Sequence, residues 1–336
     1  MAKDFDLLTQ LARFAHANDV ALSEPELIER FTADAVPRLQ SAIKDRDLVF
    51  GMRTERLFEA MVISLGGFRM LKSEDTGSVH GTEKLRTPDF RIVLENGEQW
   101  LVEVKNVHRE DPSDQVHKMG PTYLRSLQLY ADLVGAKLLV AHFWSRWGLW
   151  TLVEIPRFVT REGGLKVRMM TALIYNRLGD IGDVSINLPG PLRLVVDMRD
   201  DEGFGVQRAS VSLYRQNILL EDVRDRQLAM ILMQYGDWRL EGPIERRSVS
   251  GVRQLHFIAT PEEESENGFD SMGPASRIFS RYYRAETSIG DQVTQLHGNA
   301  RPGWFRPLAT WDFETSRLGL RIFRMRHKSG DIVAEP

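Results

Sequence analysis

The stretch TPDFRIVLENGEQWLVEVKN, residues 87–106, decides the fold that the sequence predicts. Residues 90–94 and 99–105 are rich in β-branched and aromatic side chains, which favour strands. Asn96 and Gly97 lie between these runs, and this pair is a strong hairpin signal because both residues tolerate the positive φ angles of tight turns. The sequence therefore predicts an antiparallel hairpin that turns at residues 96–97.

Three charged side chains of this hairpin are expected to lie close together. Asp89 stands at the start of the first strand, and Glu103 and Lys105 stand near the end of the second. Because side chains alternate along a strand, Glu103 and Lys105 share one face. Residue 96 is the midpoint between 89 and 103, so the two carboxylates should be nearly opposite, with about 5–6 Å between their backbones.

Two carboxylates at this separation repel each other unless one is protonated or a cation lies between them. The chain has no cysteine, and oxygen ligands favour a hard cation, so Mg²⁺ is the expected cofactor, with Mn²⁺ as a substitute. Lys105 adds a compact positive charge beside the carboxylates. This set suits phosphodiester cleavage, in which the metal activates water and neutralises charge on the phosphate.

The motifs at these positions resemble those of a known superfamily. Thr87-Pro88-Asp89-Phe90 and Glu103-Val104-Lys105-Asn106 are similar to the PD-(D/E)XK nuclease signature, found in Mrr-like restriction endonucleases, archaeal Holliday junction resolvases and RecB-type nucleases. The resemblance implies a restriction-endonuclease-like αβββαβ core with a mixed sheet over about residues 51–156. It also implies that Asp89, Glu103 and the Val104 backbone carbonyl bind the metal. Lys105 would orient the attacking water or stabilise charge on the phosphate.

A glutamate on the preceding helix usually completes the site of this superfamily. Glu55 and Glu59 are the two candidates, one turn apart on the helix expected at residues 53–65. Glu59 is preferred, because Phe58-Glu59 followed by Gly66-Gly67-Phe68 resembles the corresponding helix of Mrr-like nucleases. Glu59 would then bind a second metal or hold a metal-bound water.

Substrate contacts are expected from the helix that follows the hairpin. Gln128 occupies a position that faces the site in some superfamily members, although their Q-x-x-x-Y pattern is absent here. Lys118, Tyr123 and Arg125 lie near the start of this helix and could meet a phosphate. An ordinary place on the protein surface is the alternative for all four residues.

The rest of the chain is expected to form further helices and strands. We expect an α/β protein with an N-terminal helical segment at 1–50, the nuclease domain at 51–160, and a second α+β domain at 161–336 that recognises substrate or a partner. Helices are expected at residues 121–134, 222–235 and 275–285, and strands at 137–144, 149–155, 192–198, 209–214, 252–259, 311–313 and 318–325.

Composition excludes several classes of function. The absence of cysteine rules out disulfides, thiolate catalysis and zinc knuckles. A net charge of −3 argues against a protein that coats nucleic acid by bulk charge, although a local basic groove is compatible with it. No apolar run approaches the roughly 18 residues of a membrane helix, and the N-terminus lacks a secretory signal, so a cytoplasmic location without membrane contact is expected.

The expected function is Mg²⁺-dependent hydrolysis of phosphodiester bonds by an endonuclease of the restriction, defence or repair type. Nucleic acid is the expected partner, with DNA favoured over RNA, and a homodimer or a partner protein bound through residues 161–336 is compatible with the sequence. Two alternatives stay open: an RNA-directed nuclease, and a non-catalytic nucleic-acid-binding or assembly protein that keeps the nuclease fold.

Overall fold

The computed structural model describes residues 2–74, 79, 81–200, 207–261, 270–290, 292–300, 317–328 and 331–335. Contacts divide the chain into two compact units, Met1–Arg53 and Thr54–Pro336. The strand expected at 311–313 lies outside the described residues, and the division at residues 50 and 160 stays a prediction. Among the residues described, no helix combines the length and the apolar character needed to cross a membrane.

The first unit consists of helices. It contains α1 (Ala2–Ala17), α2 (Leu27–Lys44) and the first part of α3 (Arg46–Leu65). The rings of Phe14 and Phe31 join α1 to α2 edge to face, with 5.5 Å between their centroids. Helix α2 begins at Leu27, after a turn in which the Leu27 amide donates to the Glu24 carbonyl at 3.2 Å.

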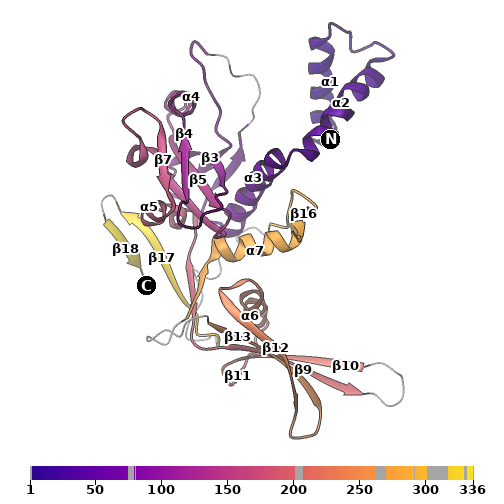
Figure 1. Ribbon diagram of the computed structural model, residues 1–336, viewed down its shortest axis with the longest axis vertical. Helices are drawn as coiled ribbons and strands as arrows, with labels where there is room; N and C mark the ends of the chain where they lie inside the picture. The colour runs from indigo at the N-terminus through magenta and orange to yellow at the C-terminus, as the bar shows by residue number, and fades with distance from the viewer. Residues whose placement is uncertain are drawn as a thin grey trace. The chain divides into compact units, whose positions relative to one another are not determined.

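The second unit starts with a five-stranded mixed sheet (Figure 1). Strand β3 runs parallel to β5, and all other neighbours in this sheet are antiparallel. The predicted α/β class with a mixed sheet is therefore confirmed, whereas the restriction-endonuclease-like arrangement of its core stays a proposal. In spatial order, the strands are β1 (Met70–Ser73), β2 (Phe90–Val93), β3 (Gln99–Val107), β5 (Lys137–Trp144) and β6 (Leu149–Glu154).

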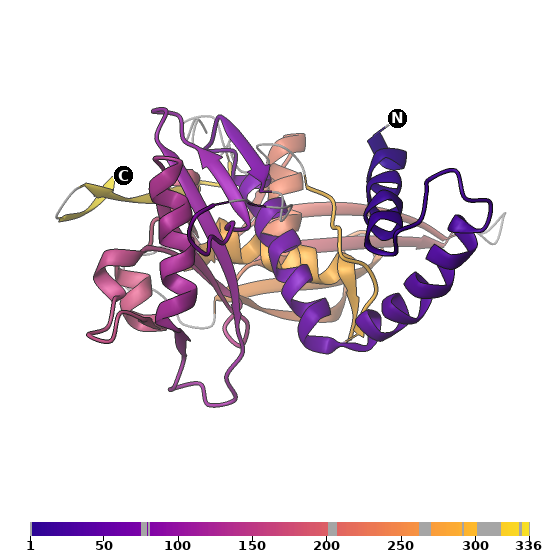
Figure 2. The ribbon, with the colours of Figure 1, turned by 90° about the horizontal axis from the view of Figure 1, so that it is seen from above.

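Helices cover both faces of this sheet (Figure 2). Helix α3 buries Leu57, Phe58 and other apolar side chains in one hydrophobic core with Trp100 of β3. The helix ends before Gly66, because the φ of +73° at Gly66 is incompatible with a right-handed helix. Helix α4 (Pro121–Leu133) buries Leu124 in a second core on the other face. Strand β3 therefore lies at the centre of the sheet, and its polar side chains enter a desolvated environment.

A small two-stranded sheet and short helices pack on the α4 side of the mixed sheet. Their apolar residues, which include Val167 and Ala172, share the second core with α4. These elements are β4 (Val116–Met119), β7 (Leu165–Arg168), η1 (Ile155–Phe158) and α5 (Met169–Ile174).

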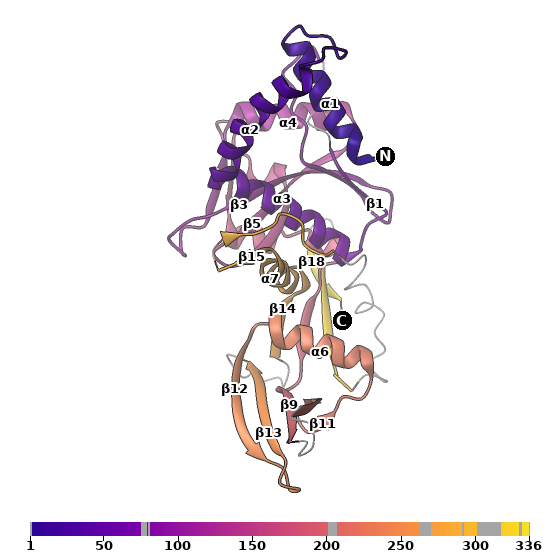
Figure 3. The same ribbon diagram turned by 90° about the vertical axis from the view of Figure 1, so that its right-hand side faces the viewer.

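The remainder of the second unit combines antiparallel sheets with two helices, and its apolar residues join the core of α3. Helix α6 (Val223–Tyr235) lies along the five-stranded sheet β11-β10-β9-β13-β12 (Figure 3). Helix α7 (Ala275–Thr287) contacts the mixed sheet through the hydrogen bond of 3.0 Å between Trp150 and Ser280. The other elements are η2 (Leu178–Ile181), β8 (Ser185–Leu188), β9 (Leu192–Asp200), β10 (Gln207–Arg215), β11 (Ile218–Leu219), β12 (Trp238–Arg247), β13 (Arg253–Pro261), β14 (Asp270–Pro274), β15 (Ser288–Ile289), β16 (Gln292–Val293), β17 (Arg321–Lys328) and β18 (Asp331–Glu335).

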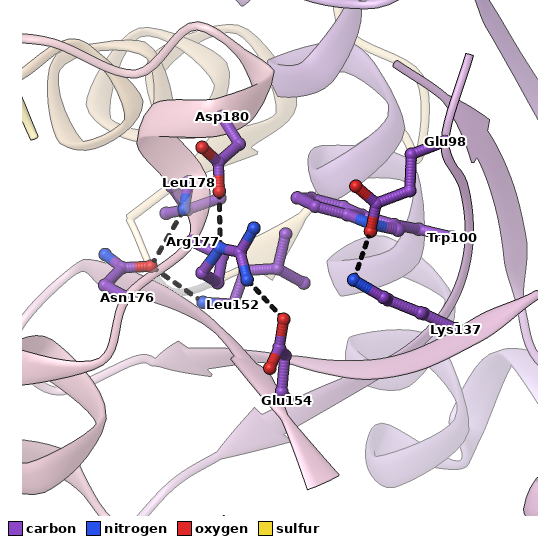
Figure 4. A network of polar contacts seen from close by, with 9 residues as sticks. All are labelled: Glu98, Trp100, Lys137, Leu152, Glu154, Asn176, Arg177, Leu178 and Asp180. Atoms are coloured by element: carbon purple, nitrogen blue, oxygen red, sulfur yellow. Dashed lines mark hydrogen bonds and ion pairs between the residues drawn. The ribbon is translucent and has the colours of Figure 1, made fainter. Parts of the chain in front are cut away.

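A polar network fixes the turn end of the β2–β3 hairpin (Figure 4). The Arg177 guanidinium lies over the Trp100 ring at 5.3 Å from its centroid, pairs with Glu154, and donates to Asp180 at 2.5 Å. The Trp100 indole donates to Glu98 at 2.9 Å. Because this network holds the beginning of β3, the register of the hairpin is fixed at the end away from Asp89 and Lys105.

Candidate active site

The hairpin register brings the predicted acidic residues together. Phe90 pairs with Val102, so the next step along the two strands places Asp89 opposite Glu103. The turn is closed by Gly97, whose φ is +86°, and by the Leu94 amide, which donates to the Glu98 carbonyl at 2.9 Å. The Val104 amide donates to Asp89 Oδ2 at 2.6 Å, which fixes this carboxylate beside β3.

Glu103 and Lys105 point to the same face of β3, as the alternation predicts. Lys105 Nζ donates to Glu103 Oε1 at 2.5 Å and to the Tyr123 hydroxyl at 3.2 Å. The Tyr123 hydroxyl in turn donates to the same Glu103 oxygen. The carboxylate of Glu103, a residue that is 2% exposed, is therefore held by two donors inside the protein.

The electrostatics of the site show an excess of buried negative charge. Burial, followed by the negative charge of Glu103, raises the pKa of Asp89 to about 7. Burial opposes the charge on Lys105, but its contacts with Glu103 dominate and raise the pKa of this lysine above its ordinary value. Lys105 is therefore a charged ammonium group in a fixed position. A further positive charge beside the carboxylates of Asp89 and Glu103 would be electrostatically favourable.

Of the two helix glutamates, Glu55 lies within electrostatic reach of Asp89, Glu103 and Lys105, and the preference for Glu59 stays a prediction. Burial raises the pKa of Glu55, with Lys105 and Glu103 among its electrostatic neighbours, and the charge of Glu55 also raises the pKa of Asp89. Glu59 instead pairs with Arg56 at 2.7 Å, one turn along the same helix. Because Arg56 and Glu59 are three residues apart on one helix, their side chains lie on the same face and can pair there.

The free oxygens of the site fit a hard cation. Asp89 Oδ1 and Glu103 Oε2 accept no hydrogen bond within the described residues, while the other oxygen of each carboxylate is held by protein donors. The N–H and C=O of a strand residue point to the same neighbour, so the Val104 carbonyl faces the same side as its amide, beyond the last β2–β3 pair. The part of the chain that the structure describes holds no group of three or more acidic or histidine side chains already gathered as a metal site.

Three of the four predicted substrate residues form no hydrogen bond or ion pair with this cluster among the described residues. Gln128 is partly buried on α4 and makes no hydrogen bond to a described residue of the site. Lys118 is exposed on β4, where it pairs in register with Lys166. Arg125 is exposed and lies 4.0 Å from Glu83. Their contact with substrate stays a prediction.

Sequence reasoning missed the role of Tyr123, which was expected to meet a phosphate. Its hydroxyl bridges Glu103 and Lys105, and the Arg86 guanidinium covers its ring at 4.2 Å from the centroid. The available signal was its place in the first turn of α4, because helical side chains lean toward the N-terminus, here toward the end of the hairpin.

Two histidines also lie beside Lys105. His117 Nδ1 and His142 Nε2 are 3.0 Å apart, and His142 is paired in register with Lys105. Burial, followed by the charge of Lys105, lowers the pKa of His117 to about 4, and burial also lowers the pKa of His142. Both imidazoles are therefore neutral near pH 7 and do not neutralise the carboxylates.

Tyr123→Phe should slow a reaction at this site without weakening substrate binding. The variant keeps the ring under Arg86 but removes the hydroxyl that orients Glu103 and Lys105, so we expect kcat to fall about 10-fold, which corresponds to about 1.4 kcal/mol, with KM unchanged. Steady-state kinetics measures this difference. An unchanged kcat would show that the hydroxyl positions nothing that matters to the reaction.

Comparisons with known proteins give little further information. No family model matches the chain, and no curated protein matches its sequence. Among solved structures, the chain is similar to Hjc, a Holliday junction resolvase from the archaeal hyperthermophile Archaeoglobus fulgidus, with 17% identity and a TM-score of 0.29 over 39% of this chain and 94% of that chain. At this TM-score the likeness defines neither the fold nor the activity of this protein.

Proposed function

We propose that this protein is a metal-dependent nuclease that hydrolyses phosphodiester bonds, with DNA as the favoured substrate. The observation that carries the proposal is the meeting of Asp89, Glu103 and Lys105 at one end of the β2–β3 hairpin. Two carboxylates with free oxygens and a fixed ammonium group match the needs of a reaction in which negative charge develops on a phosphate.

Each residue of the site would have a distinct role in the reaction. Asp89 Oδ1, Glu103 Oε2 and the Val104 carbonyl would hold Mg²⁺ or Mn²⁺, which supplies an activated water and positive charge at the phosphate. Lys105, charged and oriented by Glu103 and Tyr123, would stabilise negative charge on the phosphate oxygens. Glu55 would be a helix carboxylate able to add charge to the site.

A cleavage assay tests the proposal. Supercoiled, linear, branched and single-stranded DNA and single-stranded RNA are each incubated with the protein in Mg²⁺ and in EDTA. We expect cleavage of at least one DNA substrate in Mg²⁺, none in EDTA, and none by Asp89→Asn, which keeps an acceptor for the Val104 amide but lacks a carboxylate. Asp132→Asn, at an exposed position on α4, is the matched control and should cleave like the wild type.

Each contrary result has a distinct meaning. Cleavage that persists in EDTA or in Asp89→Asn would refute a metal site at this hairpin. Cleavage of RNA alone would transfer the proposal to an RNA-directed nuclease. Absence of cleavage on every substrate would favour the non-catalytic nucleic-acid-binding protein.

A further inference from the structure

A cavity of about 620 Å³ opens beyond the end of β3, lined by residues that the proposed active site does not use. Its walls are formed by residues 112–116, by Trp147 and Leu149, and by residues 168–171 with Leu173. The first wall belongs to the segment that follows β3, and Trp147 lies in the turn between β5 and β6. Its volume falls within the roughly 300–1,000 Å³ that is usual for small-ligand sites.

The apolar part of the lining offers flat and polarisable surfaces. Trp147 is 41% exposed and Met170 is 68% exposed, and both residues line the cavity. Aromatic faces stack with nucleobases, and a methionine sulfur packs well against aromatic rings. These side chains therefore suit a planar ring inserted between them.

The polar part of the lining suits one negative charge and a neutral ring. Arg168 lines the cavity, is exposed, and forms no ion pair with any described residue. Asp114 lines the same cavity, so a ligand with several negative charges is disfavoured. Thr171 can hydrogen-bond to the edge of a ring, and Ser113, whose hydroxyl donates to Asp111 at 2.7 Å, can still accept a hydrogen bond. A single nucleotide, with its planar base and one phosphate, meets these conditions.

The cavity is held in shape by hydrogen bonds of its own wall. Gln115, which is 3% exposed, donates through Nε2 to the carbonyls of Arg109 at 3.2 Å and Asp111 at 2.6 Å. The Met169 amide donates to the Gln115 carbonyl at 3.0 Å, which joins two of the walls. A pocket whose residues are already held in the bound arrangement loses less conformational entropy when the ligand binds.

The cavity is also close to the proposed catalytic lysine along the chain. Val107, the last residue of β3, lies two residues beyond Lys105, or about 7 Å along the strand. From the other side, Val116 of the cavity wall precedes His117, which contacts His142, the register partner of Lys105. Short stretches of β3, β4 and β5 therefore connect Lys105 with the cavity wall.

We propose that this cavity binds an unpaired nucleobase of the substrate, with its ring stacked on Trp147 and its phosphate beside Arg168. Bases of a duplex are stacked and paired, so the occupant comes from a single strand or from an unpaired position. The link to cleavage rests on the proposed nuclease function, whereas the binding itself does not. The protein would then select nucleic acid that carries unpaired nucleotides next to the cleaved bond.

Fluorescence anisotropy in EDTA tests the binding apart from any cleavage. The probes are a labelled single-stranded DNA, an RNA of the same sequence, and the blunt DNA duplex. We expect the wild type to prefer a single strand, and Trp147→Ala to lower that affinity at least about fivefold with duplex affinity unchanged, because stacking contributes about 1–3 kcal/mol per base. Met170→Ala should act in the same direction. Leu133 is 72% exposed on α4 and does not line the cavity, so Leu133→Ala is the matched control and should bind like the wild type.

Three results would overturn the proposal: no preference of the wild type for a single strand, an unchanged single-strand affinity in both cavity variants, or an equal loss for the single strand and the duplex. Preference for the DNA or for the RNA strand decides which nucleic acid supplies the base. Single-strand binding that depends on Trp147, together with no cleavage of any substrate, would refute the nuclease function and leave the cavity assignment intact.

Discussion

Lys105→Ala is expected to lower the rate of phosphodiester cleavage by about 10²- to 10³-fold, the usual loss when one positioned charge is removed from a transition state. The ammonium group of Lys105 is held by Glu103 at 2.5 Å and by Tyr123 at 3.2 Å, so its position is fixed before substrate binds. A positive charge that needs no reorganisation during the reaction contributes most to the rate. Single-turnover cleavage in Mg²⁺ measures the effect.

Lys137→Ala is the matched control for this substitution. Lys137 pairs with Glu98 at 2.6 Å, is 58% exposed, and lies at the opposite end of the hairpin from the site. We expect its rate to stay within about twofold of the wild type, since exposed ion pairs contribute little. Equal rates for the wild type and Lys105→Ala would contradict the role of the lysine. Thermal melting of both variants separates lost chemistry from lost folding.

Asp89 is expected to contribute stability to the metal-free protein that is lost as the pH rises toward 7. Burial and the charge of Glu103 raise the pKa of Asp89 to about 7, while an unfolded aspartate has a pKa of about 3.9. Between these values the folded protein binds a proton that the unfolded chain releases, so the stability contributed by this group is complete below about pH 4 and is lost as the pH rises through about 7. The slope is at most about 1.4 kcal/mol per pH unit.

Asp89→Asn should remove this part of the pH dependence. Asparagine carries no charge and can still accept the hydrogen bond of the Val104 amide, so we expect the variant to be more stable than the wild type at about pH 8 and nearly equal to it at about pH 4. Urea unfolding in EDTA across this range measures the difference. Asp132 is exposed on α4, so the free energy of unfolding of Asp132→Asn should change with pH in the same way as that of the wild type. Parallel curves for Asp89→Asn and the wild type would show that Asp89 titrates normally.

The hairpin and its charged end could be predicted because their causes are local. Alternation along residues 99–105 sets the faces of β3, and the Asn96-Gly97 turn sets the register that brings Asp89 opposite Glu103. The expected end of the helix at residue 65 matches α3, which ends at Leu65 before Gly66, whereas α3 begins at Arg46, seven residues earlier than expected. Each of these features depends on residues that are near neighbours in the chain.

Other features could not be predicted because they depend on how separate elements meet. Glu55 and Glu59 are one turn apart, and their contacts with Arg56 and with the site depend on how α3 packs on the sheet. The place of Tyr123 in the first turn of α4 is a local signal, but its contact with Glu103 also depends on how α4 packs against β3. The cavity around Trp147 forms from three segments that are distant in sequence, so no local pattern of residues indicates it.

Calorimetric titration of Mg²⁺ into the metal-free protein, at about pH 8, tests most directly whether the hairpin holds a divalent cation. We expect saturable binding to the wild type and to Asp132→Asn, and none to Asp89→Asn or Glu103→Gln, because each of the latter removes one of two carboxylates that face each other. Binding that survives in Asp89→Asn and Glu103→Gln, or is absent from the wild type, would contradict a metal site at this hairpin.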